Sequence, residues 1–223
     1  MIVNIPRSQV LSLVLVGDFN PKIFHPAWFS CQGLIKKSEE EEAVIEIIRP
    51  EISIFELEWM KFSVTRDRAT IETAKEPYYE LLRDLVVSTF RLLNHTPIKM
   101  LGINMKKTFS VETAEEWHNY GHTLAPKTPW EGLLNSPGLN SISMQGVRPD
   151  KYQGIISVVT GPTPATELKQ GISILVNDHY TLVSSDTDTV MGCNEIMDIL
   201  ESSWSASLRR ADSIIENLLR MVQ

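Results

Sequence analysis

Two histidines and a glutamate form the best arrangement for metal chemistry in this sequence. In ETAEEWHNYGH, His118 and His122 are four residues apart, so a helix would place them on one face, with Glu115 one turn before His118. Zinc would need a further ligand from elsewhere, no Glu stands between the histidines as in a metalloprotease motif, and Gly121 weakens a helix here. We therefore favour two partly exposed helix histidines over a metal site.

Other catalytic patterns are weaker still. Asp186 and Asp188 in SSDTDT could hold a cation, but Asp, Ser and Thr are ordinary cap and turn residues before a helix. The segment GPTPATELKQG lacks the glycine-lysine-serine run that cradles a phosphate. No Ser has the sequence context of a nucleophile elbow. Catalytic Ser-His-Asp and Cys-His sets form from residues that are distant in the chain, so the sequence leaves both possibilities open. We expect a protein that is not an enzyme and needs no cofactor.

Composition and charge limit the classes of protein that fit. The 223 residues are 43% hydrophobic and 22% charged, which suits a folded protein with a sizeable core. The formal net charge is −7, whereas non-specific binding of nucleic acid needs Lys and Arg side chains to replace the counterions of the phosphates. The charged segment Lys36–Glu42 is expected to be a solvated loop. Nucleic acid is therefore not expected as a partner.

Cysteines and hydrophobic runs bear on the compartment. Cys31 and Cys193 are the only cysteines, too few for a disulfide framework or a four-thiolate metal site, so we expect buried thiols in a reducing compartment. The first residues lack the basic start and the cleavage site of a signal peptide. No run approaches the ~20 apolar residues of a membrane-spanning helix. These features predict a cytoplasmic protein without a membrane partner.

Runs of β-branched and aliphatic residues predict the strands. The first lies at Val10–Phe19, three or four follow within Ala43–Thr73, and another fills Ile98–Phe109. Strands resume at NSISMQGVRP, QGIISVVT, GISILVN and YTLVSS. Two hairpins are expected to turn at a polar pair around an Asp, at Asp67 in FSVTRDRATIET and at Asp178 in ILVNDHYTLVSS.

Capping residues and helical spacing predict the helices. Asn20-Pro21 opens a helix that should end before Gly33. Pro77 opens a long helix with an apolar stripe, and Thr113 caps another helix with acidic residues in its first turn. The final helix is expected from about Cys193 to Val222.

The two halves of the chain show similar features in the same order. In each half a strand is followed by a short helix, three or four antiparallel strands and a long helix. The offset between matching residues grows from 85 for Gly17 and Gly102 to 112 for Val64 and Val176, which indicates a repeat whose second copy has longer loops. The matching positions are Gly17 and Gly102, Asn20 and Asn104, Trp28 and Trp117, Arg49-Pro50-Glu51 and Arg148-Pro149-Asp150, and Val64 and Val176.

This order of elements resembles the tandem repeat of the TATA-box-binding-protein fold, and IEIIRPE is similar to the Arg-Glu-Pro turn of that fold. The resemblance covers nearly the whole chain. It implies an α+β protein of two fused β-α-β(3-4)-α repeats, residues 1–96 and 97–223, which share one core. They would form a curved antiparallel sheet with two long helices against its convex face. VTRDRATI, YYELL and LGIN are also similar to a sporadically distributed, uncharacterised family of bacterial proteins with no assigned activity.

The resemblance also implies a broad sheet face that is free to meet a partner. TATA-binding proteins open the minor groove with paired phenylalanines. Aromatic residues lie near the equivalent strands of the first copy only, so these wedges are not duplicated and DNA binding of that kind is not expected. The charged residues at the tip of the first hairpin are further candidates for binding a partner. We favour the alternative that they form a solvated ion-pair turn. The candidate binding residues are Phe55, Trp59, Phe62, Arg66, Asp67 and Arg68.

Together these patterns predict a cytoplasmic binding protein that engages a protein partner, or its own copy, through the sheet face or a sheet edge. A bacterial immunity or defence component would have this character. Two other classes stay open. One is a small-ligand protein with a cavity between the long helices and the sheet, and the other is a metal-dependent enzyme that uses the histidines of the ETAEEWHNYGH segment.

Overall fold

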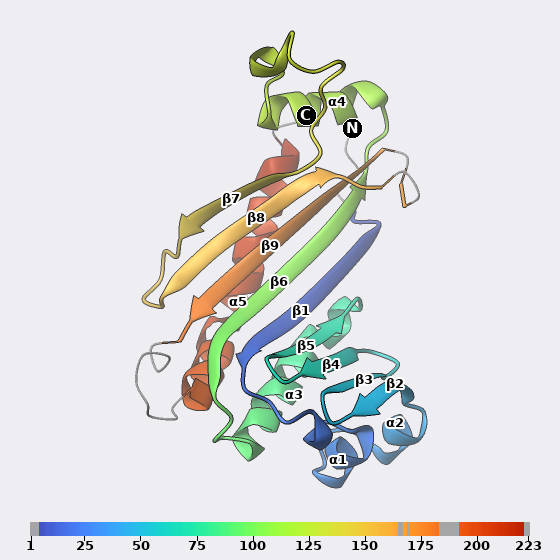
Figure 1. Ribbon diagram of the computed structural model, residues 1–223, viewed down its shortest axis with the longest axis vertical. Coiled ribbons are helices and arrows are strands. Elements are labelled where there is room, and N and C mark those ends of the chain that lie inside the picture. Colours follow the sequence, from blue (N-terminus) through green and yellow to red (C-terminus); the bar gives the residue numbers. More distant parts are fainter. Residues whose placement is uncertain (1–4, 165–166, 169, 183–191, 221–223) are drawn as a thin grey trace.

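The computed structural model describes residues 5–164, 167–168, 170–182 and 192–220 (Figure 1). It confirms an α+β protein, built on one open antiparallel sheet of nine strands in the order β2-β3-β4-β5-β1-β6-β9-β8-β7. Asp186 and Asp188 lie outside the described residues. The strands are β1 (Ser8–Gly17), β2 (Val44–Arg49), β3 (Ile52–Glu56), β4 (Lys61–Thr65), β5 (Arg68–Thr73), β6 (Ile98–Ser110), β7 (Ile142–Val147), β8 (Gly154–Pro162) and β9 (Gly171–Thr181).

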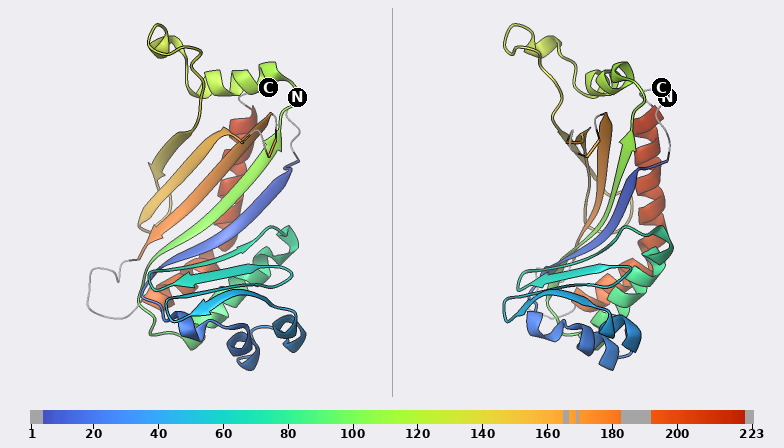
Figure 2. Two further views of the ribbon diagram at one scale, coloured as in Figure 1. Left: turned by 45° about the vertical axis from the view of Figure 1, so that its right-hand side comes forward. Right: turned by 90° about the vertical axis from the view of Figure 1, so that its right-hand side faces the viewer.

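Two long helices, α3 (Tyr79–Leu92) and α5 (Gly192–Arg220), cover one face of the sheet. Figure 2 shows that the sheet curves away from them, so the helices lie on its convex side and the concave side is open. The two helices contact each other, and Trp204 Nε1 on α5 donates a 2.9 Å hydrogen bond to Glu80 on α3. Among the described residues, no helix has both the length and the hydropathy needed to cross a membrane.

The core lies between the convex face and the helices because alternate residues of the strands point to that face. On β1, Leu11, Leu13 and Leu15 are fully buried, whereas Ser12 and Val14 point to the concave side. Burying each such leucine stabilises the fold by about 1.5–3 kcal/mol. β1 pairs with β6 over nearly its whole length, so these two strands form the centre of the sheet.

The expected hairpin at Asp178 is wrong. β9 runs without interruption from Gly171 to Thr181, and it pairs with β6 and β8 along its length. Asp178 lies inside this strand, buried on the convex side. The last part of the chain therefore has three strands where four were predicted. The hairpin at Asp67 does form, between β4 and β5, so Val64 and Val176 do not occupy matching positions beside a turn.

The first helical region is more broken than predicted. Asn20 caps a single 3-10 turn, Pro21–Ile23, and His25 then caps a separate helix, α1 (Pro26–Cys31). The interruption coincides with Pro26, which lacks the N–H needed to continue a helix. The loop expected at Lys36–Glu42 is also wrong, because residues Lys37–Glu41 form the short helix α2. Its first turn is closed by Glu39, which accepts a hydrogen bond from the backbone N–H of Lys36 at 2.7 Å.

The region between β6 and β7 holds the helix α4 (Ala114–Leu124), whose N-cap is Thr113 as predicted. Further 3-10 turns lie at Glu76–Tyr78 before α3 and at Thr128–Trp130 after α4. Figure 1 shows α4 and the connector that follows it at one end of the sheet, whereas α1 and α2 lie at the other end beside β2 and β3. The two ends of the molecule thus carry different surfaces.

Candidate interaction site

β7 is an unprotected edge strand. It pairs with β8 on one side only, and its outward backbone groups form no hydrogen bond to any residue that the structure describes. Every residue of this strand after Ile142 is exposed, including Met144 at 65% and Val147 at 88%. The strand, ISMQGV, contains no charged residue and no proline. Such an edge is a template for pairing with another strand.

The opposite edge, β2, is protected. Its register shifts between Ile45 and Ile47, which marks an irregularity that disturbs the row of outward backbone groups. Glu46 forms an ion pair with Lys61 on β4 at 2.5 Å, and Arg49 ends the strand. Charged side chains and a bulge are the usual devices that prevent edge pairing. Of the two edges, β7 is therefore the one open to a further strand.

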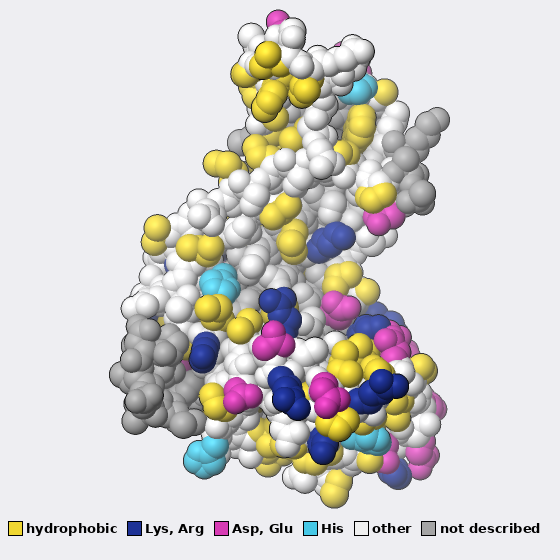
Figure 3. Space-filling model, in the orientation of Figure 1, with side chains coloured by type: hydrophobic (Ala, Val, Ile, Leu, Met, Phe, Trp, Pro, Cys, Tyr) yellow, Lys and Arg dark blue, Asp and Glu magenta, His cyan; other side chains and the backbone are white. Residues whose placement is uncertain are grey.

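The concave face next to β7 carries few charges, and one row of polar side chains crosses it. Asn104 on β6, Asn177 on β9 and Ser157 on β8 are successive partners across the sheet. Figure 3 shows few charged side chains over the middle strands, with charges more frequent towards β2–β5. The side-chain oxygen of Asn177 is buried without a hydrogen-bond partner among the described residues. From β2 to β7 the row is Val44, Glu56, Lys61, Glu72, Ser12, Asn104, Asn177, Ser157 and Gln145.

A buried charge cluster fixes the turn that follows β7. Arg148 forms ion pairs with Asp150 at 2.6 Å and with Asp178, and Arg210 of α5 reaches Asp178 at 2.5 Å. Burial raises the pKa of Asp150, but the hydrogen bonds and charge of Arg148, the backbone N–H of Tyr152 and the charge of Arg210 together hold that pKa below its ordinary value. The guanidinium carbon of Arg148 also lies 3.5 Å from the centre of the Tyr180 ring. The cluster ties the end of β7 to β9 and α5.

The predicted aromatic binding residues belong to the core. Phe55 on β3 and Phe62 on β4 point to the buried side of the sheet, and Trp59 is buried in the turn between these strands. Phe62 lies between two rings, with centroid distances of 5.3 Å to Phe55 and 5.4 Å to Phe24. These side chains have almost no exposed surface for a partner, so their prediction as binding residues is corrected.

The charged hairpin tip has a local structural role. Asp67 accepts a 2.6 Å hydrogen bond from the Thr65 hydroxyl, which lowers its pKa. The backbone oxygens of Arg66 and Asp67 accept hydrogen bonds from Phe19 and Gly17, so the tip holds the chain as it leaves β1. Arg68 begins β5. These contacts favour the structural reading of the tip.

The predicted metal ligands do not converge. Glu115, His118 and His122 are exposed on α4, and a ring nitrogen of His122 lies 2.8 Å from the backbone oxygen of His118 in a hydrogen bond. Within the described ranges, no three His, Cys, Asp or Glu side chains are placed to hold a metal ion. The zinc hypothesis therefore receives no support from the geometry. The expectation that both thiols are buried is wrong for Cys31, whose thiol is exposed, whereas Cys193 is buried.

Two features were missed in the sequence, although both left a signal there. The segment ISMQGV lacks the charges and prolines that protect an edge strand, but its residue types alone predict a strand without indicating that it lies at an edge. Asp178 follows a run of apolar strand residues, where a buried carboxylate needs a cation, whereas the polar pair that it forms with Asn177 predicts a turn. No protein-family model matches the chain, and no curated protein shows significant sequence similarity to it.

Proposed function

We propose that this chain is a non-enzymatic interaction protein that extends its sheet by strand addition at β7, and that the added strand is β7 of a second copy. The observation that carries this proposal is the contrast between the two sheet edges. β7 is uncharged and exposed, whereas β2 has an irregular register and charged side chains. Backbone hydrogen bonds would supply affinity, and the exposed Met144 and Val147 would supply apolar contact.

The composition of β7 suits pairing with itself. An antiparallel pair related by a two-fold axis brings the same residues together from both copies, so any charge would meet a like charge. β7 has none. An axis at Met144 keeps both concave faces on one side, places Met144 opposite Met144 of the other copy, and places Ser143 opposite Gln145. The most exposed apolar side chain on the convex side of this strand is then covered.

The assembly is expected to stop at two copies. Pairing of β7 with β7 leaves only the two β2 edges free, and these have the protective features described above. The Arg148 cluster holds the end of β7 in place before pairing, which reduces the entropy lost on association. A closed dimer with one continuous sheet follows.

The test is the light-scattering mass of the purified protein and of two matched variants. Met144→Lys places two cations opposite each other at the axis, so we expect a dimer for the unchanged chain and a monomer for this variant. Val44→Lys also introduces a lysine at an exposed apolar position, on β2, and should leave the dimer intact. A monomeric unchanged chain, or equal effects of the two variants, would contradict the proposal.

A cross-link tests the register. Opposed residues in an antiparallel pair have Cα atoms roughly 4.5–5.5 Å apart, within the range that a disulfide spans. Met144→Cys in a Cys31→Ser background should therefore give a disulfide-linked dimer on mild oxidation, while Val44→Cys in the same background should not. Failure of Met144→Cys to cross-link while the mass stays dimeric would show that another surface forms the dimer.

We further propose that residues 1–96 and 97–223 are two joined repeats of the TATA-binding-protein type. The support is topological: β1 and β6 lie side by side at the sheet centre, and each is followed by helical segments, antiparallel strands and one long helix on the convex face. An experimental structure in which the halves superpose with β1 on β6, β5 on β9 and α3 on α5 would support it. Helices α3 and α5 that fail to superpose would contradict it.

A further inference from the structure

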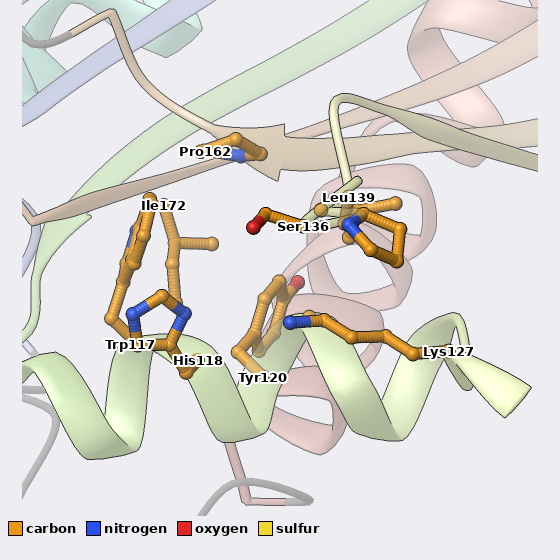
Figure 4. Close-up of a pocket in the computed structure, with 11 residues that line it drawn as sticks. Trp117, His118, Tyr120, Lys127, Ser136, Leu139, Pro162 and Ile172 are labelled. Carbon is orange, nitrogen blue, oxygen red and sulfur yellow. The ribbon is translucent and has the colours of Figure 1, made fainter. Parts of the chain in front are cut away.

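A cavity of about 410 Å³ lies between α4, the connector that follows it, and the ends of β8 and β9 (Figure 4). It lies at the end of the sheet away from the turn that follows β7 and from the Arg148 charge cluster. Its walls are largely apolar and aromatic, with Trp117 and Tyr120 on α4, Leu139 on the connector, Pro162 on β8 and Ile172 on β9. A volume of this size lies within the range of small-molecule sites.

Two hydrogen bonds fix the helical wall of the cavity. Trp117 Nε1 donates to the backbone oxygen of Gly171 at 3.1 Å, which holds α4 against the start of β9. The Tyr120 hydroxyl lies 2.6 Å from the Thr160 hydroxyl on β8. Because both aromatic rings are anchored to the sheet, the cavity is preformed and a ligand need not order this wall.

One cation faces the cavity without a counter-charge. Lys127 is partly buried, and its ammonium group has no ion pair or hydrogen bond to any residue in the described part of the chain. Figure 4 shows this side chain extending along the cavity towards Tyr120. A half-buried ammonium group beside apolar walls is stabilised by an anion placed there, more strongly than on an open surface.

The opposite wall carries a strained residue. Ser136 has a φ of 53°, and it is the one non-glycine residue with positive φ among those described. Its side chain faces the cavity in Figure 4. Backbone conformations of this kind cost of order 1–3 kcal/mol and concentrate at ligand sites. Ser136 thus adds a hydroxyl donor to the wall of the cavity that Lys127 also lines.

From these observations we infer that the cavity binds a small organic anion with a flat or branched apolar body. The carboxylate lies at Lys127 and Ser136, and the apolar body lies between Trp117, Leu139 and Ile172. This site is separate from the proposed β7 interface. It also differs from the cavity between the long helices and the sheet that the sequence led us to consider.

Isothermal titration calorimetry with a matched pair of probes tests the inference. We expect 2-naphthoate to bind the full-length protein at least tenfold more tightly than 2-naphthalenemethanol, which has the same ring system and no charge. Lys127→Met keeps the apolar stem and should abolish this preference, while Lys127→Arg should preserve it. The control Lys107→Met removes a cation of a different surface and should change neither affinity.

A cavity-filling variant locates the bound probe. A Cβ at Gly121 would lie 3.5 Å from Leu139 Cβ, an ordinary contact, so Gly121→Leu fills the cavity and leaves every charge in place. We expect this variant to retain cooperative thermal unfolding and to lose 2-naphthoate binding. The inference is overturned if the unchanged protein does not bind 2-naphthoate at ~1 mM, if both probes bind equally, or if binding survives Gly121→Leu or is unaffected by Lys127→Met.

Discussion

Arg148 and Asp178 form an ion pair whose side chains are 0% and 2% exposed, between the turn after β7 and the middle of β9. Both charges are removed from water, so each depends on the other and on the hydrogen bonds around them. Arg210 and Asp150 complete the cluster with one further charge of each sign. The pair therefore links the proposed interface strand to the core and the long helix α5.

Removal of one charge from this pair should destabilise the fold strongly. Asp178→Ala leaves Arg148 buried with one carboxylate fewer, and we expect the free energy of unfolding to fall by about 3–5 kcal/mol. Urea denaturation monitored by circular dichroism measures this. The control is Glu51→Ala, which removes an exposed partner 3.9 Å from Arg66 and should change the free energy by no more than about 1 kcal/mol. Similar losses for the two variants would contradict a structural role for the cluster.

The cluster should also make stability depend on acid pH. The pKa of Asp150 in the folded protein is below its ordinary value of 3.8, so its ionised form stabilises the fold fully above pH 3.8. That stabilisation is lost as the pH falls through the lower, folded-state pKa. We expect Asp150→Asn to be less stable than the unchanged chain at neutral pH and equally stable well below pH 3.8. Urea denaturation at both pH values tests this, and a pH-independent difference would count against it.

The two thiols should react very differently. Burial raises the pKa of the Cys193 thiol to about 11, and the thiol lies 3.1 Å from the backbone oxygen of Thr96. Since the thiolate is the reactive form, Cys193 should be inert to Ellman's reagent in the folded protein, while the exposed Cys31 reacts. In urea both thiols should react. Native reaction of both thiols, with Cys31→Ser as the control, would show that Cys193 is accessible.

The aromatic rings of the first half should matter for stability. Phe62→Ala removes a ring packed between Phe24 and Phe55, and we expect a loss of about 3–5 kcal/mol in the free energy of unfolding. Leu133→Ala, at a side chain that is 74% exposed, should change it by less than about 0.5 kcal/mol. Thermal and urea unfolding provide the comparison. A small effect of Phe62→Ala would return this ring to the list of surface candidates.

Most helices and strands of this protein could be predicted because their signals are local. The alternation in β1, the apolar stripe of α3 and the cap at Thr113 each depend on residues within a few positions of one another. The charged helix α2 was missed because a short acidic segment resembles a loop in composition. It is held by the Lys36 to Glu39 hydrogen bond and by a bond from Trp59 Nε1 to Glu39 at 2.8 Å.

The candidate sites depended instead on residues far apart in the chain. Asp178 is a strand residue because Arg148 and Arg210, about thirty positions away on either side, neutralise it. Met144 is exposed only because no further strand or helix covers β7, and the ligand cavity exists only because α4 is held against β8 and β9. Local sequence decides which backbone conformation each segment prefers. Burial, charge pairing and the open edge are properties of neighbours in space, which no local pattern contains.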